Sequence, residues 1–318
     1  MFQRQPLALI ARLAVLILVA LTASGFAGAL WWALDLFSHF RLQYVAAAAL
    51  MAALLAWVRD RRFALVAAAV AAINLVPVAR LVNEPAAPAP VAAESSLRIL
   101  SLNVLDYNQQ YDRVIAYARR QRPDVLLLVE LTPAWTARVD DLAQEYPHRW
   151  VEGGSGDGGI AMMSRRAPVL AEALALAGGD APSYMLTFDL PDGPMSVLGT
   201  QLEPPLGPAR SRQRNQRLSA LAQFARDWRG PLAIVGDLNT SPFSPHFHQL
   251  LRDGGLHRCG QGTGLVPTWP SLFPPLWIQL DHCLTNDAVQ SWDLQAGEYV
   301  GSDHFPISVY IAPRPGGR

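Results

Sequence analysis

The sequence predicts an α/β domain that follows an N-terminal membrane region of about three helices. Residues 1–83 of the 318-residue chain are almost entirely apolar, with charges only at intervals. The rest of the chain contains short apolar runs that are typical of buried strands, and several of them end on a polar residue. Helical segments alternate with these runs, which is the pattern of an α/β fold.

Three uncharged stretches in residues 1–83 are candidate membrane spans, namely Leu13–Leu34, Leu42–Val58 and Phe63–Ala79. Their many alanines make each stretch weakly hydrophobic, but small residues allow helices to pack closely. A water-soluble helical subdomain is the alternative, and it would expose an almost charge-free surface, which soluble domains avoid. We therefore expect a multi-pass region whose partner is the lipid bilayer.

The arginines predict how these spans are oriented, because positive charges stay on the cytoplasmic side. Arg4 and Arg12 precede the first span, and the tight loop 59–62 between the second and third spans is rich in arginine. Everything after Arg80 should then lie outside the cytoplasm. A signal peptide cleaved near residues 27–29 is the alternative, and it also leaves the large domain outside.

The second domain begins after a stiff linker, Glu84–Ser96, which is rich in proline and alanine. Pro123 stops one predicted helix, Thr132-Pro133 begins another, and a turn at 191–194 joins two strands. The predicted strands are Leu97–Val104, Asp124–Glu130, Ile160–Ser164, Tyr184–Leu190, Met195–Leu202, Leu232–Val235, Trp277–Leu284 and Ile307–Ile311. The predicted helices are Asp112–Gln121, Thr132–Tyr146, Ala209–Trp228 and Pro245–Arg252.

The two cysteines, Cys259 and Cys283, form no metal-binding pattern. They could pair in an oxidising compartment, or both could be buried free thiols. The sequence alone does not decide between these states, and we expect free thiols.

The central motif of the chain is Gly236-Asp237-Leu238-Asn239, directly after the apolar run Leu232–Val235. Asp237 and Asn239 are two residues apart, so in extended backbone their side chains point to the same side. A carboxylate beside an amide can hold a water and a phosphate oxygen around a hard cation. An Asx turn that begins the next helix is the alternative.

Polar residues also follow other predicted strands, and a lone Glu130 ends a strand that is otherwise apolar. A carboxylate in that position is costly unless it is paired or bound to metal. The remaining strand-end candidates are Asn103, Asp281, Asp303 and His304.

In this order these residues resemble the endonuclease/exonuclease/phosphatase (DNase I-like) superfamily. The G-D-x-N motif at 236–239, followed by G-S-D-H-x-P at 301–306, is the most specific part, and the similarity covers 97–313. The segment Thr268-Trp269-Pro270 and the membrane region are similar to its bacterial membrane-anchored branch. The resemblance implies a four-layer α/β/β/α sandwich of two mixed sheets. Together with the positions of the arginines, it predicts that this domain is held on the outer side of a bacterial inner membrane.

The resemblance also implies a role for each site residue. Asp237 would activate the attacking water, Asn239 would hold a phosphate oxygen, His304 would stabilise the developing charge, and Asp281 would fix the tautomer of His304. Asn103, Glu130 and Asp303 would lie at the metal. Hard oxygen ligands favour Mg²⁺ or Mn²⁺ over zinc.

One position departs from the family pattern. Many members have Thr-His at the end of the strand Met195–Leu202, where this chain has Thr200-Gln201. Gln201 cannot donate a proton as an imidazolium does, although its amide can bind a phosphate oxygen. Arg212, in a helix that also carries Arg210, Arg214 and Arg217, is a second candidate for substrate binding; a solvated helix face is the alternative.

We therefore predict a membrane-anchored, divalent-metal-dependent phosphoesterase that hydrolyses phosphodiester bonds and has no evident protein partner. The second domain has slightly more acidic residues than arginines, which does not favour nucleic acid over a phospholipid headgroup or a small phosphodiester. The alternative, motivated by Gln201, is a non-catalytic membrane-associated binding protein on a degenerate phosphoesterase scaffold.

Overall fold

The computed structural model describes residues 4–84, 92–154, 158–177, 182–260 and 262–314. The chain divides into two compact units, which are described separately. The first contains Met1–Glu84 and Ser241–Pro245, and the second contains Pro85–Thr240 and His246–Arg318. Most of the predicted linker, Glu84–Ser96, lies outside the described residues.

The N-terminal unit is helical and has a small apolar core of its own. Its helices are α1 (Arg4–Phe26), α2 (Trp32–Asp35), η1 (Leu36–Ser38), α3 (Arg41–Trp57) and α4 (Arg61–Val82). The predicted spans Leu42–Val58 and Phe63–Ala79 correspond to α3 and α4. The predicted bounds Leu13–Leu34 are wrong, because α1 already ends at Phe26 and a turn separates it from α2. Uncharged sequence continues through that turn, so composition could not locate the helix end.

Two of these helices, Gln5–Phe26 and Arg61–Val82, are long and apolar enough to cross a membrane. A third span results if Trp32–Ser38 and Arg41–Trp57, which meet at 64°, are counted together. Inside the bundle the side chain of Asn74 joins three helices. It donates to Thr22 Oγ1 at 2.9 Å and accepts from Arg41 Nη1 at 2.9 Å. In an apolar environment such polar groups are stable only when they are paired.

The second unit is a sandwich of two six-stranded sheets. The first sheet has the order β11-β12-β1-β2-β4-β3 and the second the order β5-β6-β7-β8-β10-β9. Each sheet contains one parallel pair, β1 with β2 and β7 with β8, among antiparallel neighbours, so both are mixed. The strands are β1 (Leu97–Asn103), β2 (Val125–Val129), β3 (His148–Glu152), β4 (Ile160–Ser164), β5 (Leu170–Leu174), β6 (Ser183–Leu190), β7 (Gly193–Gln201), β8 (Leu232–Asp237), β9 (His257–Arg258), β10 (Asp281–Thr285), β11 (Val289–Ala296) and β12 (Ile307–Pro313).

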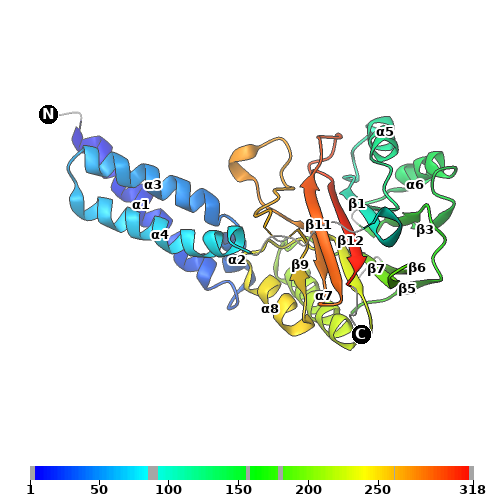
Figure 1. The fold of residues 1–318 in the computed structure, drawn as a ribbon. Helices are drawn as coiled ribbons and strands as arrows, with labels where there is room; N and C mark the ends of the chain where they lie inside the picture. The colour runs from blue at the N-terminus through cyan, green and yellow to red at the C-terminus, as the bar shows by residue number, and fades with distance from the viewer. Residues whose placement is uncertain (1–3, 85–91, 155–157, 178–181, 261, 315–318) are drawn as a thin grey trace. The chain divides into compact units, whose positions relative to one another are not determined.

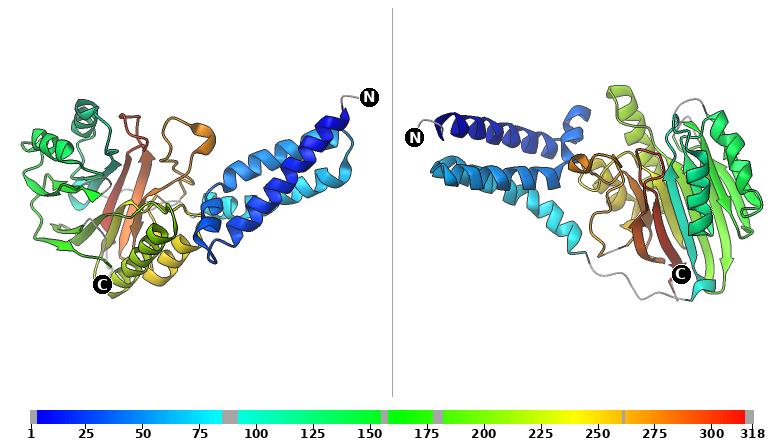
Figure 2. Two further views of the ribbon diagram at one scale, coloured as in Figure 1. Left: turned by 180° about the vertical axis from the view of Figure 1, so that it is seen from behind. Right: turned by 90° about the horizontal axis from the view of Figure 1, so that it is seen from above.

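Helices cover the outer face of each sheet, which confirms the predicted four-layer sandwich (Figures 1 and 2). The first sheet is covered by α5 (Tyr111–Gln121) and α6 (Pro133–Val139), and the second by α7 (Pro208–Asp227) and α8 (Pro245–Gly254). The short helices η2 (Ala93–Ser95), η3 (Asp140–Leu142) and η5 (Pro274–Leu276) lie in connections. The central core lies between the sheets and contains residues such as Leu127 and Val235, while two further clusters lie between each sheet and its helices. This explains why the central strands are continuous apolar runs.

The elements that the sequence analysis missed or misplaced lie mainly at the sheet edges. The strands β3, β5, β9 and β11 were not predicted. They lie at the edges of the sheets, and polar residues interrupt their sequences and weaken the apolar signal. The predicted strand Trp277–Leu284 begins only at Asp281. This shift matters for the site, because it makes Asp281 the first residue of β10 instead of an interior one.

The cysteines form a disulfide, so the expectation of free thiols is wrong. Cys259 and Cys283 are bonded and both are buried, with the backbone N–H of Cys259 donating to the carbonyl of Cys283 at 2.8 Å. The disulfide thus links Cys283 on β10 to Cys259, which directly follows β9 and lies 24 residues away in sequence, and spacing alone could not reveal this pairing. Such bonds persist in oxidising compartments.

Reducing this disulfide should destabilise the second unit. Replacing both Cys259 and Cys283 by Ala is expected to lower its free energy of unfolding by about 2–4 kcal/mol, mainly because the unfolded chain loses a constraint. Denaturant titration of the full chain in detergent would measure the change. Reductant should destabilise the wild type by a similar amount and leave the double variant unaffected. A wild-type transition that is insensitive to reductant would contradict the prediction.

Candidate active site

The ends of the central strands bring the predicted site residues to one edge of the sandwich. Asn103 ends β1, and Glu130 directly follows the parallel neighbour β2. In the other sheet Gln201 ends β7 and lies in register with Asp237 at the end of β8. Because β10 runs antiparallel to β8, its first residue, Asp281, is the partner of Asp237. Register therefore gathers side chains that are far apart in the sequence.

Asp237 lies at the centre of this group and is fully buried. Its Oδ1 accepts the backbone N–H of Asn239 at 2.8 Å, and its Oδ2 accepts from the side-chain amides of Asn103 and Asn239, each at 3.2 Å. Burial raises the pKa of Asp237 to about 8, and nearby Asp281 adds to this effect, while His304 opposes it. Gly236 precedes it because its φ is +145° and an added Cβ would lie 1.8 Å from the Thr200 carbonyl oxygen.

His304 and Asp281 form a buried pair beside Asp237. His304 Nδ1 lies 2.7 Å from Asp281 Oδ2, and its Nε2 faces Asp237 Oδ2 at 3.9 Å. Burial disfavours the imidazolium, but the carboxylates of Asp281, Asp237 and Asp303 outweigh it and raise the pKa of His304 to about 10. The ring therefore carries a positive charge at neutral pH and presents its Nε2–H towards Asp237. A proton donor in this position can stabilise charge that develops on a phosphate oxygen.

Glu130 is held from both sheets. Asn103 Nδ2 donates to its Oε1 at 2.7 Å, and Gln201 Nε2 lies 3.3 Å from the same oxygen. The backbone N–H of Glu130 donates to Gln201 Oε1 at 3.3 Å. Burial raises the pKa of Glu130. The amide of Gln201 thus positions Glu130, a use that its place in the sequence did not suggest.

Asp303 is positioned by a segment that the sequence indicated only through its resemblance. Trp269 Nε1 donates to Asp303 Oδ2 at 2.9 Å, and Ser271 N donates to the Asp303 carbonyl at 2.7 Å. Thr268 Oγ1 accepts the backbone N–H of Asp281 at 3.1 Å. The segment 268–271 therefore orients two site carboxylates, and neither its tryptophan nor its threonine was predicted as a site residue.

Arg214, which the sequence did not single out among four arginines, contacts a candidate site residue. It is fully buried, and its Nη1 donates to the carbonyl of Asn239 at 3.0 Å. Asn239 needs this support because its φ is +47°, in the left-handed region. Its Nδ2 donates to Leu202 O at 2.8 Å as well as to Asp237, so in this structure Asn239 positions the Asp237 carboxylate.

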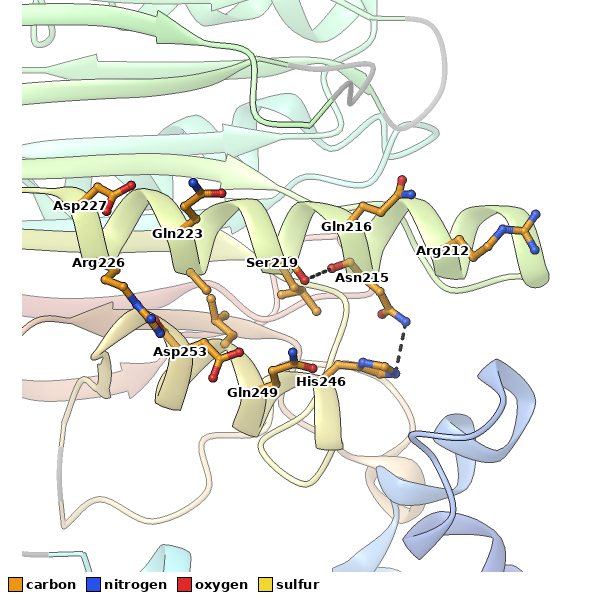
Figure 3. A pocket seen from close by; sticks show the side chains of 13 residues that line it. Arg212, Asn215, Gln216, Ser219, Gln223, Arg226, Asp227, His246, Gln249 and Asp253 are labelled. Carbon is orange, nitrogen blue, oxygen red and sulfur yellow. Dashed lines mark hydrogen bonds between the residues drawn. The ribbon is translucent and has the colours of Figure 1, made fainter.

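Arg212, in contrast, is not brought to this edge. It is exposed and lies on a different face of α7, where it lines a cavity of about 830 Å³ between α7 and α8 (Figure 3). Asn215 and His246 meet across that cavity at 3.2 Å. Of the four arginines, Arg217 is buried in an ion pair with Glu203 at 3.0 Å. Helical spacing indicated a shared face but not which arginines point inward.

The donor set at the edge fits a hard divalent cation. Asp303 Oδ1 is buried and has no hydrogen-bond partner within the described part of the chain, and the same holds for Asp281 Oδ1. Unsatisfied carboxylate oxygens suit Mg²⁺ or Mn²⁺, and Asp303 is close enough for its charge to act on Glu130. Asp237, Asp281 and His304 also have ligand atoms within 4.8 Å of one another. The His304–Asp281 hydrogen bond already uses one ring nitrogen, so Glu130 and Asp303 are the better oxygen donors.

Metal binding should strengthen as the pH rises. The charge of a bound cation favours the deprotonated forms of its ligand Glu130 and of nearby Asp237, and the pKa values of both carboxyl groups are raised. The increase in Tm caused by Mg²⁺ should therefore be small well below pH 8 and should grow as the pH rises towards that value. Without metal, stability should instead fall as the pH rises. The raised pKa of Asp237 contributes stability that is present below its unfolded pKa of 3.8 and is lost as the pH rises through about 8. Thermal unfolding with Mg²⁺ and with chelator tests both statements, and a pH-independent Mg²⁺ effect would refute the first.

Comparison with known proteins matches the sequence of this chain to one family and its structure to one fold. The model of the endonuclease/exonuclease/phosphatase family matches residues 97–304. Among solved structures, humanized D. rerio TDP2 is similar with a TM-score of 0.56 and 18% identity, covering 68% of this chain and 99% of that one. An endonuclease/exonuclease/phosphatase from Beutenbergia cavernae has a TM-score of 0.56, 20% identity and coverages of 69% and 72%. Sphingomyelinase C from Streptomyces griseocarneus has a TM-score of 0.51, 19% identity and coverages of 69% and 99%. At these identities the likeness shows the shared fold. No curated protein matches the chain.

Proposed function

Because this chain belongs to the endonuclease/exonuclease/phosphatase family, we propose that it is a membrane-anchored hydrolase that cleaves phosphodiester bonds with a divalent cation. The observation that carries the proposal is the buried His304–Asp281 pair, which faces Asp237 across 3.9 Å. Phosphodiester hydrolysis needs a positioned water and stabilisation of charge on the phosphate oxygens. Asp237 can position the water, and His304 can stabilise the charge on the phosphate oxygens.

In the proposed reaction Asp237 orients the attacking water and takes its proton. His304 donates a hydrogen bond from Nε2–H to a phosphate oxygen, and Asp281 keeps the ring charged and oriented. Glu130 and Asp303, with Asn103 nearby, would hold Mg²⁺ or Mn²⁺, which when bound neutralises charge on the phosphate. The amide of Asn103 now donates to Glu130 and Asp237, so its role as an oxygen ligand remains a prediction.

We further propose that the second unit lies on the outer side of a bacterial inner membrane, outside the cytoplasm. The distribution of Arg4, Arg12 and the arginine-rich loop 59–62 supports this orientation. The Cys259–Cys283 disulfide supports it independently, because such bonds are rare in the cytosol. The apolar helices of the N-terminal unit would provide the anchor.

The phosphodiester could belong to a nucleic acid or to a phospholipid. A D. rerio TDP2 structure contains a single-strand DNA product, and another protein of this fold is a sphingomyelinase, so both chemistries occur on the fold. The non-catalytic alternative was motivated by Gln201. It is disfavoured because Gln201 is engaged in positioning Glu130, and the other site positions carry the residue types that the chemistry requires.

Turnover by the full chain in detergent tests the proposal. Supercoiled DNA, a phospholipid and a soluble phosphodiester would be assayed with Mg²⁺, with Mn²⁺ and with chelator, using wild type and His304→Ala. We expect hydrolysis of at least one substrate that requires metal and is abolished by the substitution. If no substrate is cleaved and neither metal raises Tm, the catalytic proposal fails.

A further inference from the structure

A run of consecutive exposed apolar residues, Leu272–Trp277, projects from the sandwich (Figure 1, orange). The exposed fraction is 70% for Leu272, 53% for Phe273, 41% for Leu276 and 37% for Trp277. Pro274 and Pro275 between them are exposed as well. Folded domains seldom leave such a continuous apolar run in water unless it binds something. The run therefore indicates a surface that is covered in the working protein.

The run is held in a fixed shape. At its base Trp269 and Ile278 exchange two backbone hydrogen bonds, with N···O distances of 2.7 and 3.0 Å. At its tip Leu276 N donates to Phe273 O at 3.0 Å, and Trp277 N donates to Pro274 O at 3.1 Å, which closes the turn η5. A turn that is closed from within presents its side chains outward without needing a protein partner to order it.

The same segment is connected to the candidate active site. Trp269, at the base of the run, donates to Asp303 Oδ2 at 2.9 Å. At the other end the ring of Trp277 packs edge-on against Phe305, with centroids 5.9 Å apart, and Phe305 directly follows His304. A partner that covers the run would therefore lie near Asp303 and His304, which are proposed to act on the phosphate.

The composition of the run identifies its partner. From Cys259 to Leu280 the sequence contains no charged residue, so the surface offers no charge complementarity to a nucleic acid or an acidic protein. Tryptophan, phenylalanine, leucine and proline in an exposed turn are suited to the boundary between headgroups and acyl chains. The chain also carries helices that are apolar enough to cross a membrane. We propose that Leu272–Trp277 inserts into the surface of the lipid bilayer, and that the phosphoester taken by the site is carried by a membrane lipid. The substrate part rests on the proposed function, whereas the insertion does not.

Fluorescence quenching tests the insertion with the full chain in phosphatidylcholine nanodiscs. Lipids with brominated acyl chains should quench Trp277, so the Trp277→Phe variant should lose less emission to bromine than the wild type. Trp292→Phe serves as the matched control, because Trp292 on β11 is buried and its ring stacks on that of Tyr310 on β12. The Trp292→Phe variant should lose as much emission to bromine as the wild type does. High salt should not change the result, since no charge is involved. If Trp277→Phe is quenched as much as the wild type, the insertion is overturned.

Turnover tests the substrate class in nanodiscs that also contain phosphatidylethanolamine and phosphatidylglycerol. A Phe273→Ser/Leu276→Ser double variant should cleave lipid at least about tenfold more slowly, because it loses apolar area at the bilayer. It should cleave a soluble phosphodiester at the wild-type rate. An equal loss on both substrates, or cleavage of the soluble diester but of no lipid by the wild type, would overturn the lipid assignment. If the wild type cleaves neither, the proposed function fails, and quenching still decides the insertion.

Discussion

Asp237→Asn is expected to lower metal-dependent phosphodiester turnover by about 10²- to 10⁴-fold, the range for the loss of a general base. The carboxylate is the only ionisable group that ends β8, and its two oxygens are held by the amides of Asn103 and Asn239. An amide of the same size cannot accept the proton of the attacking water. The rate should be measured at saturating Mg²⁺ on a soluble phosphodiester, so that lipid binding does not contribute.

The matched control is Asp227→Asn, which makes the same chemical change on an exposed residue of α7. It should leave the rate unchanged. Thermal unfolding of both variants establishes that they are folded. Wild-type turnover by folded Asp237→Asn would exclude Asp237 as the base and would direct attention to Glu130.

Asp281→Asn is the second substitution with a large expected effect, and its signature is a shift in pH dependence. Burial alone lowers the pKa of His304, and the charge of Asp281 is the first of the effects that raise it to about 10. Without that charge we expect the pKa of His304 to fall, so that a smaller fraction of the rings is charged at neutral pH. Turnover there should fall by about 10²-fold or more, as expected when a charged donor to the phosphate is lost.

Relative to the wild type at the same pH, Asp281→Asn should recover part of its activity as the pH is lowered, because His304 is protonated again, whereas protonation of Asp237 and Glu130 slows both proteins. The rate of the wild type should not gain from the same change. Asp253→Asn, on α8 at the cavity beside α7, is the control and should follow the wild-type profile. A uniform loss at every pH would show that Asp281 acts only by supporting the local structure.

The types of residue in the site could be predicted from the sequence because they follow strands with strong local signals. Leu232–Asp237 is apolar and then polar, and the G-D-x-N and G-S-D-H-x-P motifs are short and continuous. Such signals depend on neighbours in sequence, as do the predicted helix Ala209–Trp228 and the apolar stretches of the N-terminal unit. The family and the four-layer fold followed from these motifs by resemblance.

The contacts among these residues depend on which strands pair and in which register. Residues two apart lie on opposite faces of a helix, so the spacing separates Arg212 from Arg214 on α7, but only the packing shows that the face of Arg214 is the buried one. Likewise, the sequence indicated only that Gln201 replaces a histidine that could act as an acid. Its contact with Glu130 joins residues that lie 71 positions apart, so only the fold shows it.

The sequence by itself determined which side chains are available for chemistry and which stretches are apolar enough to enter a membrane. Only the tertiary structure decided that Cys259 pairs with Cys283, that Asp281 faces His304, and that the apolar run at 272–277 remains in water. The physical reason is that hydrophobic patterning acts within one element, whereas pairing, burial and pKa values result from the packing of elements that are distant in the chain.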